Sequence, residues 1–168
     1  MYYIREADIA DVAAIHEIAH QTWWPTYRPI LSDEQITYML SVLYSEEKLH
    51  EQIANHEQTF LILTEESMPV AFAAYSPRSE NPEVYKLHKL YCLPQTQGKG
   101  YGVALINAVE IRVLAAGKQL LDLNVNRFNK ARSFYEKAGF KVIYEEDIAI
   151  GPYWMNDFVM QKSLVKAF

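Results

Sequence analysis

The chain has little cysteine, fewer basic than acidic residues, and no long apolar run. Its 168 residues include one cysteine, so an internal disulfide is excluded and a reducing compartment is expected. Lys and Arg number 16 against 21 Asp and Glu, and the net charge of −5 argues against a duplex nucleic-acid partner, which needs a basic face. No apolar run approaches the ~20 residues that span a bilayer. Met1–Arg5 lacks the apolar region of a signal peptide, so we expect a cytoplasmic protein without a membrane partner.

The composition that remains fits one globular domain. Half of the residues are hydrophobic and 22% are charged, as in ordinary soluble domains. No internal repeat, low-complexity segment or linker divides the chain. We therefore expect a single domain over residues 1–168, with helices dominating 1–57 and strands dominating 59–162.

Hydrophobic periodicity and capping residues predict the elements. Asp8, Ser32 and Ser45 are suited to cap three helices, and a loop rich in aromatics, Trp23–Pro29, is predicted after the first of them. Strands are predicted at 2–5, 59–64, 69–76, 84–93, 119–125, 140–147 and 154–161, and further helices at 100–116 and 130–138. This order predicts a mixed sheet with helices on both faces, an α+β architecture of three α/β/α layers.

The most informative stretch is 87–102, an apolar strand that stops at a proline, followed by a glycine-rich turn and an amphipathic helix. Gly98, Gly100 and Gly102 are three of only six glycines in the chain. Glycines let the backbone approach a ligand closely. The following helix presents unpaired N–H groups and the positive end of its dipole. The stretch therefore predicts a site for phosphate groups.

Other interpretations of this turn are weaker, although a turn without any ligand stays open. A phosphate loop of the strand–GxxxxGK[ST]–helix kind is excluded, because the chain contains no such string. A dinucleotide fingerprint would need a third glycine where Val103 or Leu105 stands, depending on the register. Asp122 falls roughly where a ribose-binding acid is expected, but in mid-strand, and the unit follows three strands instead of opening a βαβ domain.

Two motifs resemble those of the GNAT superfamily of acetyl-CoA-dependent N-acetyltransferases. Gln97–Gly102 resembles the signature Q/R-x-x-G-x-G/A, and Asn126–Phe140 resembles N-x-x-A-x-x-x-Y-E-K-x-G-F with local variation. The motifs have the order and separation of the family over residues 59–162, and the region around 87–100 is more weakly similar to bacterial polyamine acetyltransferases. The resemblance implies a mostly antiparallel sheet with splayed central strands, an acetyl-CoA-binding core at 59–162, acceptor-side helices at 1–57, and no metal.

The resemblance also implies which residues contact acetyl-CoA. The implied contacts are Leu90, Tyr91 and Cys92 on the strand, Gln97, Gly98, Lys99, Gly100, Tyr101 and Gly102 in the turn, and Asn129 in the second motif. Backbone amides of the turn would hold the pyrophosphate, and the pantetheine arm would pair with the strand like an added strand. Lys99 either adds a charge or is solvated, and Asn129 can also cap the helix at 130–138.

Tyr135 and His88 are the candidate catalytic residues. Tyr135 matches the family tyrosine that protonates the leaving thiolate, and a phenol of pKa ~10 can donate to a thiolate whose conjugate acid has a pKa of ~8.5. Plain helix packing is the alternative. His88 is the candidate base for the acceptor amine by its pKa, with Glu83, Tyr91 or a water relay as alternatives. An exposed His88 with a purely structural role also stays open. Cys92 resembles a small buried hydrophobe more than a nucleophile, because no catalytic His/Asp pattern surrounds it.

The implied acceptor site contains Trp23, Trp24 and Tyr27, whose aromatic faces attract ammonium groups. Core packing or a homodimer contact is the alternative, above all for Trp24. The acidic run 145–147 is either a substrate patch or a solvated edge. We expect an enzyme that acetylates a primary amine of a small molecule, an alkylamine or polyamine. An acetyl-CoA sensor without turnover and an enzyme acting on protein N-termini stay open.

Overall fold

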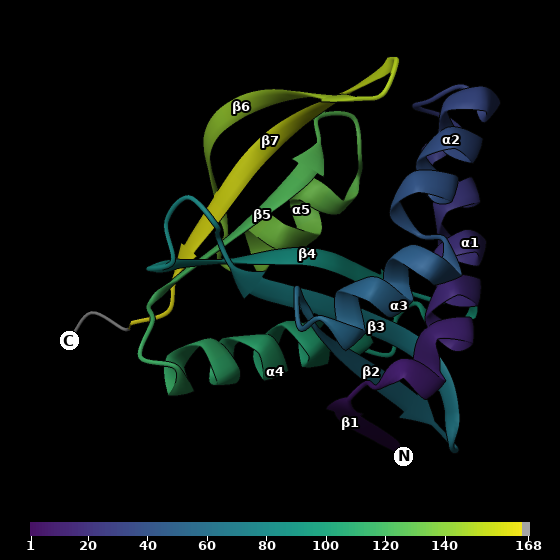
Figure 1. The fold of residues 1–168 in the computed structure, drawn as a ribbon. Coiled ribbons are helices and arrows are strands. Elements are labelled where there is room, and N and C mark those ends of the chain that lie inside the picture. Colours follow the sequence, from purple (N-terminus) through teal and green to yellow (C-terminus); the bar gives the residue numbers. More distant parts are fainter. Residues whose placement is uncertain (166–168) are drawn as a thin grey trace.

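The structure is a computed structural model that describes residues 1–165, and it contains a seven-stranded sheet flanked by helices (Figure 1). The strands are β1 (Tyr2–Glu6), β2 (Thr59–Glu65), β3 (Met68–Pro77), β4 (Val84–Cys92), β5 (Leu120–Asn126), β6 (Lys141–Ile150) and β7 (Tyr153–Ser163). The helices are α1 (Val12–Tyr27), α2 (Asp33–Leu43), α3 (Glu46–Ala54), α4 (Tyr101–Ala115) and α5 (Ala131–Lys137), with 3-10 turns at Ile9–Asp11 and Pro94–Thr96. Within the described part of the chain, no helix is long and apolar enough to cross a membrane.

The sheet has the strand order β1-β2-β3-β4-β5-β7-β6, and only β4 and β5 run parallel. That parallel pair is short, because it joins Val84–Leu87 to Leu120–Leu123 and no further. Beyond it the two strands diverge, and the rest of β4 is paired with β3 alone. The predicted α+β class, with a mostly antiparallel sheet and splayed central strands, is therefore confirmed.

β4 also contains an irregularity just where it leaves β5. Ala74 on β3 pairs with Lys89 and Tyr75 pairs with Leu87, so His88 is an extra residue without a direct partner. An extra residue of this kind bends the strand and changes the direction of nearby side chains. The bulge and the divergence of the strands thus coincide at His88.

Helices cover the N-terminal half of the sheet from both sides, α1–α3 from one and α4 from the other (Figure 1). On the α1–α3 side, Phe72 stacks on Phe60 and packs at a tilt against Tyr91, with ring centroids 6.3 and 5.8 Å apart. α4 turns a buried stripe toward the sheet through Leu105, Val109 and their neighbours, the spacing of an amphipathic helix. The core therefore lies in two layers around β2–β4.

The predicted caps are present, with one adjustment. Ser32 and Ser45 accept hydrogen bonds from the backbone N–H groups of Gln35 and Lys48, both at 3.1 Å, and begin α2 and α3. Asp8 caps the short 3-10 turn that precedes α1, accepting from the N–H of Ala10 at 2.9 Å. Local side-chain to backbone bonds of this kind are readable from the sequence.

The prediction of an aromatic loop at Trp23–Pro29 is wrong, because α1 continues through Pro25 to Tyr27. Trp23 and Tyr27 extend the buried stripe that begins with Ile15 and Ala19, at a spacing of four residues. A proline inside a helix costs about 3 kcal/mol, whereas burying a large apolar side chain gains about 1.5–3 kcal/mol. Burial of the two aromatic side chains therefore offsets the proline.

Candidate active site

A cavity of about 920 Å³ opens where β4 and β5 diverge. It is walled by the ends of these strands, the glycine turn, the start of α5 and the end of α1. It brings together these predicted site residues: Tyr27, His88, Leu90, Tyr91, Cys92, Gln97, Gly98, Gly100, Tyr101, Gly102, Asn129 and Tyr135. Segments from four parts of the sequence thus converge on one space.

The glycine turn has the backbone geometry that only glycine adopts readily. Gly98 and Gly100 have φ angles of 85° and 80°, in the left-handed region that costs other residues about 1–2 kcal/mol. Gly102 packs closely against α5, since a Cβ there would lie 3.0 Å from Cζ of Phe134 and the ring would have to shift. Gly100 begins α4 without a side-chain cap, so the first N–H groups of the helix are left without intrahelical partners beside the cavity. This arrangement suits an anionic phosphate.

The end of β4 forms the next wall. Leu90, Tyr91 and Cys92 line the cavity on the side where β5 has moved away, so their strand edge is open to an extended ligand. Burial raises the pKa of the Cys92 thiol to about 11. The thiol therefore stays protonated at neutral pH, which argues against a covalent acyl intermediate.

Tyr135 reaches the cavity from α5. Its ring packs edge-on against Phe134 and Phe140, with centroids 5.3 and 6.1 Å away. Burial raises the pKa of its phenol above the ordinary value, and the nearby Cys92 raises it further. The hydroxyl is therefore protonated across the physiological range, as a proton donor must be.

His88 faces the cavity from the bulge of β4, with Nε2 2.7 Å from the hydroxyl oxygen of Ser76. Burial above all, together with the charges of Lys86, Lys89 and Arg78, lowers the pKa of its imidazole to about 3. The ring is thus neutral at physiological pH. A group with this pKa is a weak acceptor for the proton of an ammonium group.

Asn129 and its neighbour Lys130 close the cavity at the start of α5. The side-chain carbonyl of Asn129 accepts a hydrogen bond from the N–H of Ala131 at 2.9 Å, but the N-cap residue of α5 is Lys130, so Asn129 lies one position before the cap that was predicted for it. Lys130 is exposed, lines the cavity, and was missed in the sequence. A lysine at a helix N-terminus is unfavourable, because its positive charge lies at the positive end of the helix dipole. This unfavourable position was the feature of the sequence that could have indicated an anion-binding role for Lys130.

Three predicted site residues do not line the cavity. Lys99 turns back to Glu65, with Nζ 2.7 Å from its carboxylate, so it does not project over the turn. Trp23 is 2% exposed and packs against Tyr27 and Tyr44 in the core. Trp24 is partly buried beneath the guanidinium of Arg28. The assignments of Trp23 and Trp24 to the acceptor pocket are corrected accordingly, since the helical path of α1 directs both side chains elsewhere.

Comparison with known proteins identifies the family of the chain. A family model described as an acetyltransferase (GNAT) domain matches residues 27–160. The chain is 30% identical to the spermidine N(1)-acetyltransferase of Thermoplasma acidophilum over 95% of both proteins, and 27% identical to an N-acetyltransferase of Mycobacterium tuberculosis over 94% of this chain and 100% of that protein.

Solved structures give the same result. The crystal structure of the PaiA N-acetyltransferase from Thermoplasma acidophilum in complex with coenzyme A aligns with a TM-score of 0.83 and 30% identity, covering 97% of this chain and 99% of that one. The family match spans more than half of the sequence and includes both motifs. The chain therefore belongs to the GNAT acetyltransferase family and is an N-acetyltransferase.

Proposed function

We propose that the protein transfers the acetyl group of acetyl-CoA by direct attack to a primary amine of a small molecule, with polyamines such as spermidine as the first acceptors to test. The observation that carries the proposal is that the glycine turn, the open edge of β4 and Tyr135 line one cavity. The relatives named as a spermidine N(1)-acetyltransferase and as an acetyltransferase in complex with coenzyme A support the choice of acceptor and co-substrate.

The pyrophosphate would rest on the free N–H groups at the start of α4, between Gly98 and Gly102. Lys130 would add a positive charge at the mouth of the same cavity. The pantetheine arm would then run along Leu90–Cys92, where the backbone of β4 has no partner from β5. A backbone N–H of this edge would polarise the thioester carbonyl, as oxyanion-stabilising groups do.

The transfer then needs two proton movements. The acceptor loses a proton, its neutral nitrogen attacks the carbonyl carbon, and the carbon–sulfur bond breaks. Tyr135 gives its proton to the leaving thiolate and regains one from the nitrogen, so that the products are the amide, the thiol of coenzyme A and one released proton. Because His88 is a weak proton acceptor, we assign it an orienting role, and we assign the first proton to water.

The test is a measurement of free thiol released from acetyl-CoA with a panel of acceptors. Spermidine, other alkylamines, amino acids, aminoglycosides and a peptide N-terminus are compared by kcat/KM. Spermidine and short diamines are expected to give the highest values. A preferred peptide N-terminus or aminoglycoside would contradict the choice of acceptor, and no thiol release with any amine would favour a binding module without turnover.

A further inference from the structure

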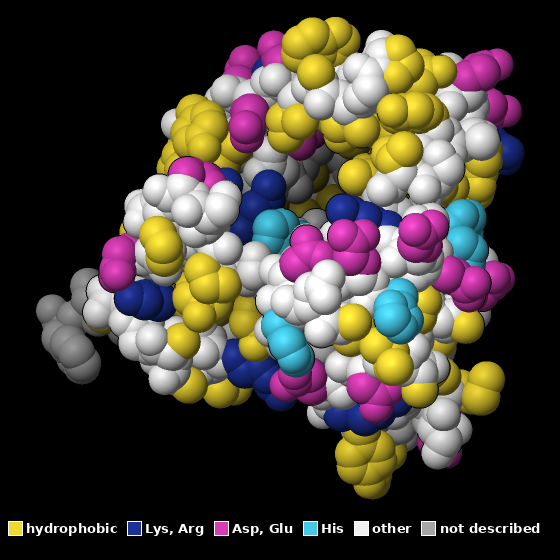
Figure 2. Space-filling view, in the orientation of Figure 1, with side chains coloured by type: hydrophobic (Ala, Val, Ile, Leu, Met, Phe, Trp, Pro, Cys, Tyr) yellow, Lys and Arg dark blue, Asp and Glu magenta, His cyan; other side chains and the backbone are white. Residues whose placement is uncertain are grey.

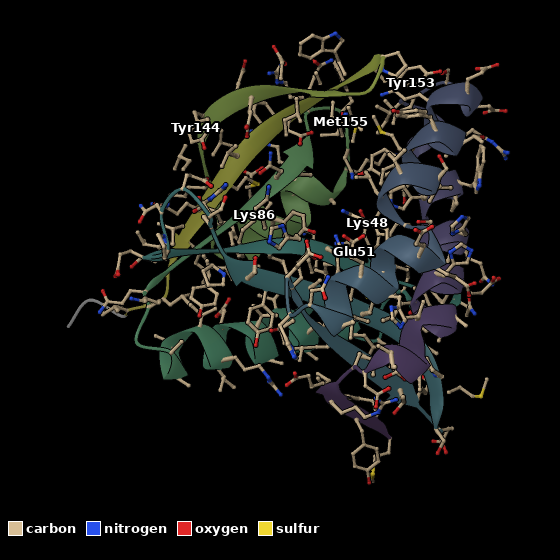
Figure 3. All side chains as sticks on the ribbon, in the orientation of Figure 1. Lys48, Glu51, Lys86, Tyr144, Tyr153 and Met155 are labelled. Atoms are coloured by element: carbon tan, nitrogen blue, oxygen red, sulfur yellow. The ribbon has the colours of Figure 1, made fainter. Side chains whose placement is uncertain are left out.

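The C-terminal part of the sheet has one face that α5 does not cover. Phe158 on β7 lies beneath the guanidinium of Arg132 on α5, at 4.5 Å from the ring centroid, so its side chain points to the covered face. Its neighbour Asp157 therefore points to the opposite face. Figure 2 shows that face as a hollow between the β6–β7 hairpin and α2–α3, and Figure 3 shows Lys86 on β4 and Met155 on β7 beside it.

Two carboxylates meet a single neutral amide on this face. The side-chain nitrogen of Asn124 on β5 donates to Glu146 on β6 and to Asp157 on β7, each at 3.2 Å. Asp157 is 6% exposed. Burial raises the pKa of its carboxyl, and the negative charge of Glu146 acts in the same direction. The three side chains thus place two like charges close together with one shared donor.

Among residues 1–165 the cluster has unused acceptor atoms, and no cation forms an ion pair with the carboxylate of Glu146 or Asp157. Within residues 1–165, Oδ1 of Asp157 and Oδ1 of Asn124 are buried without a hydrogen-bond partner. Arg127 donates from Nε to the backbone carbonyl of Asp157 at 3.3 Å, but its ion pairs are with Glu145 and Asp147, and it acts on the Asp157 carboxyl only through its charge. Lys86 acts on Asp157 only through its charge, without a direct ion pair in the described chain. A buried acceptor atom without a hydrogen bond is unfavourable, and so are two neighbouring negative charges. A bound group that donates hydrogen bonds and carries a positive charge would relieve both.

The cluster is continuous with the cavity, because Asn124 forms part of the cavity wall. An ammonium group offers three N–H donors and one positive charge, so it matches the two unused oxygens and the carboxylate pair. The reacting nitrogen must be neutral, however, and carboxylates favour the protonated form of an amine. An ammonium held here is therefore one that does not react.

We propose that Asn124, Glu146 and Asp157 form a subsite for a second, unreacting ammonium group of the acceptor, so that diamines and polyamines are preferred over monoamines. This inference rests on the proposed acetylation of a small amine and adds the specificity-determining residues. Glu146 belongs to the acidic run 145–147 of the sequence, but only this member of the run reaches Asn124 among the described contacts.

The test is calorimetric binding of spermidine and of propylamine in the presence of saturating coenzyme A. Asp157→Asn and Glu146→Gln each remove one charge with little change of shape, and Glu145→Gln is the matched control on the adjacent exposed position. Asp157→Asn is expected to weaken spermidine binding about tenfold or more, as expected when an ammonium loses a buried charged partner, and Glu146→Gln is expected to weaken it several-fold. Propylamine binding is expected to be unchanged in all three variants.

Lys86→Met supplies an independent check. Removing this like charge is expected to strengthen spermidine binding, because Lys86 competes for the same carboxylates. The inference is overturned if Lys86→Met weakens spermidine binding, if Glu145→Gln acts as strongly as Asp157→Asn, if both amines are affected equally, or if the wild type binds spermidine no better than propylamine.

Thiol release in parallel separates this inference from the proposed function. Turnover of propylamine without any advantage for spermidine would reject the subsite and leave amine acetylation in place. The expected binding pattern without thiol release from any amine would reject the proposed acetyl transfer and support the subsite as an amine-binding site.

Discussion

The hydroxyl of Ser76 on β3 lies 2.7 Å from Nε2 of His88 on β4, and this contact holds a neutral imidazole at the bulge beside the cavity. A base with a pKa of about 3 has little driving force to take a proton from an ammonium group. His88→Gln is therefore expected to lower kcat/KM less than about tenfold, whereas loss of a general base typically costs 10²–10⁴. The pH profile between 6 and 9 should keep its shape. A larger loss that is relieved as the pH rises would restore His88 as the base.

Tyr135→Phe keeps the ring contacts with Phe134 and Phe140 and removes only the hydroxyl. The fold and the affinity for coenzyme A should survive, because the proposed contacts to the pyrophosphate and to the pantetheine arm do not use that hydroxyl. Turnover is expected to fall by roughly 10²-fold or more if the phenol protonates the thiolate. The measurement is single-turnover thiol release together with coenzyme A titration. An unchanged chemical step would remove Tyr135 from the mechanism.

Local signals in the sequence were sufficient for much of the fold. The glycine turn, the serine caps and the alternation of β5 depend on residues a few positions apart, and the structure has them where they were expected. α1 differs because the prolines and aromatics at 23–29 favour a loop locally. The helix is favoured only in the folded protein, because Trp23 and Tyr27 then pack into the core.

Contacts between segments that are distant in the sequence could not be predicted from local patterns. Lys99 pairs with Glu65, 34 residues earlier, because the end of β2 happens to lie beside the turn. Asn124 joins Glu146 and Asp157 across 22 and 33 residues through the register of three strands. A shift of one residue in that register would turn these side chains to the other face. The cavity wall formed by the glycine turn and the end of β4 could therefore be predicted from motifs, whereas the contacts among Asn124, Glu146 and Asp157 could not.

Gly100 and Gly117 form a matched pair for testing the phosphate turn. Both have left-handed φ angles, 80° and 79°, and a Cβ on either would meet open space. Gly100→Val and Gly117→Val should both destabilise the protein by about 1–2 kcal/mol through backbone strain. Acetyl-CoA at 100 times its Kd should stabilise the native protein by about 2.7 kcal/mol and so raise its melting temperature. Only Gly100→Val is expected to lose this rise. Equal shifts in the two variants would contradict the assignment of the turn.

Trp23 is expected to contribute to stability and not to acceptor recognition. It is 2% exposed in the core, whereas Trp154 on β7 is 57% exposed and serves as the control. Trp23→Ala should lower the free energy of unfolding by about 3–5 kcal/mol, and Trp154→Ala by less than about 0.5 kcal/mol. Urea unfolding measures both. A rise in the KM of spermidine for Trp23→Ala with unchanged stability would return this residue to the acceptor pocket.

Lys89 makes stability depend on pH in a predictable direction. The residue is 7% exposed, and its ammonium donates to the side-chain oxygens of Gln58 at 2.6 Å and Gln52 at 3.3 Å, with the Phe60 ring centroid 5.1 Å away. Burial above all, together with the charges of Lys48 and Lys86, lowers its pKa from 10.5 to about 7. Between these two values the unfolded chain binds more protons at this residue than the native protein does.

The free energy of unfolding should therefore rise with pH across that window, by up to about 1.4 kcal/mol per pH unit from this residue alone. Below pH 7 both states carry the proton, so the penalty for burying the charge is constant and the native protein is at its least stable with respect to Lys89. Lys89→Met removes the titration, and the wild-type value minus the Lys89→Met value should increase between pH 7 and pH 9 in urea unfolding. Lys141→Met, at an exposed position on β6, is the control and should give a flat difference. A flat difference for Lys89→Met as well would show that the buried ammonium keeps its ordinary affinity for the proton in the folded protein.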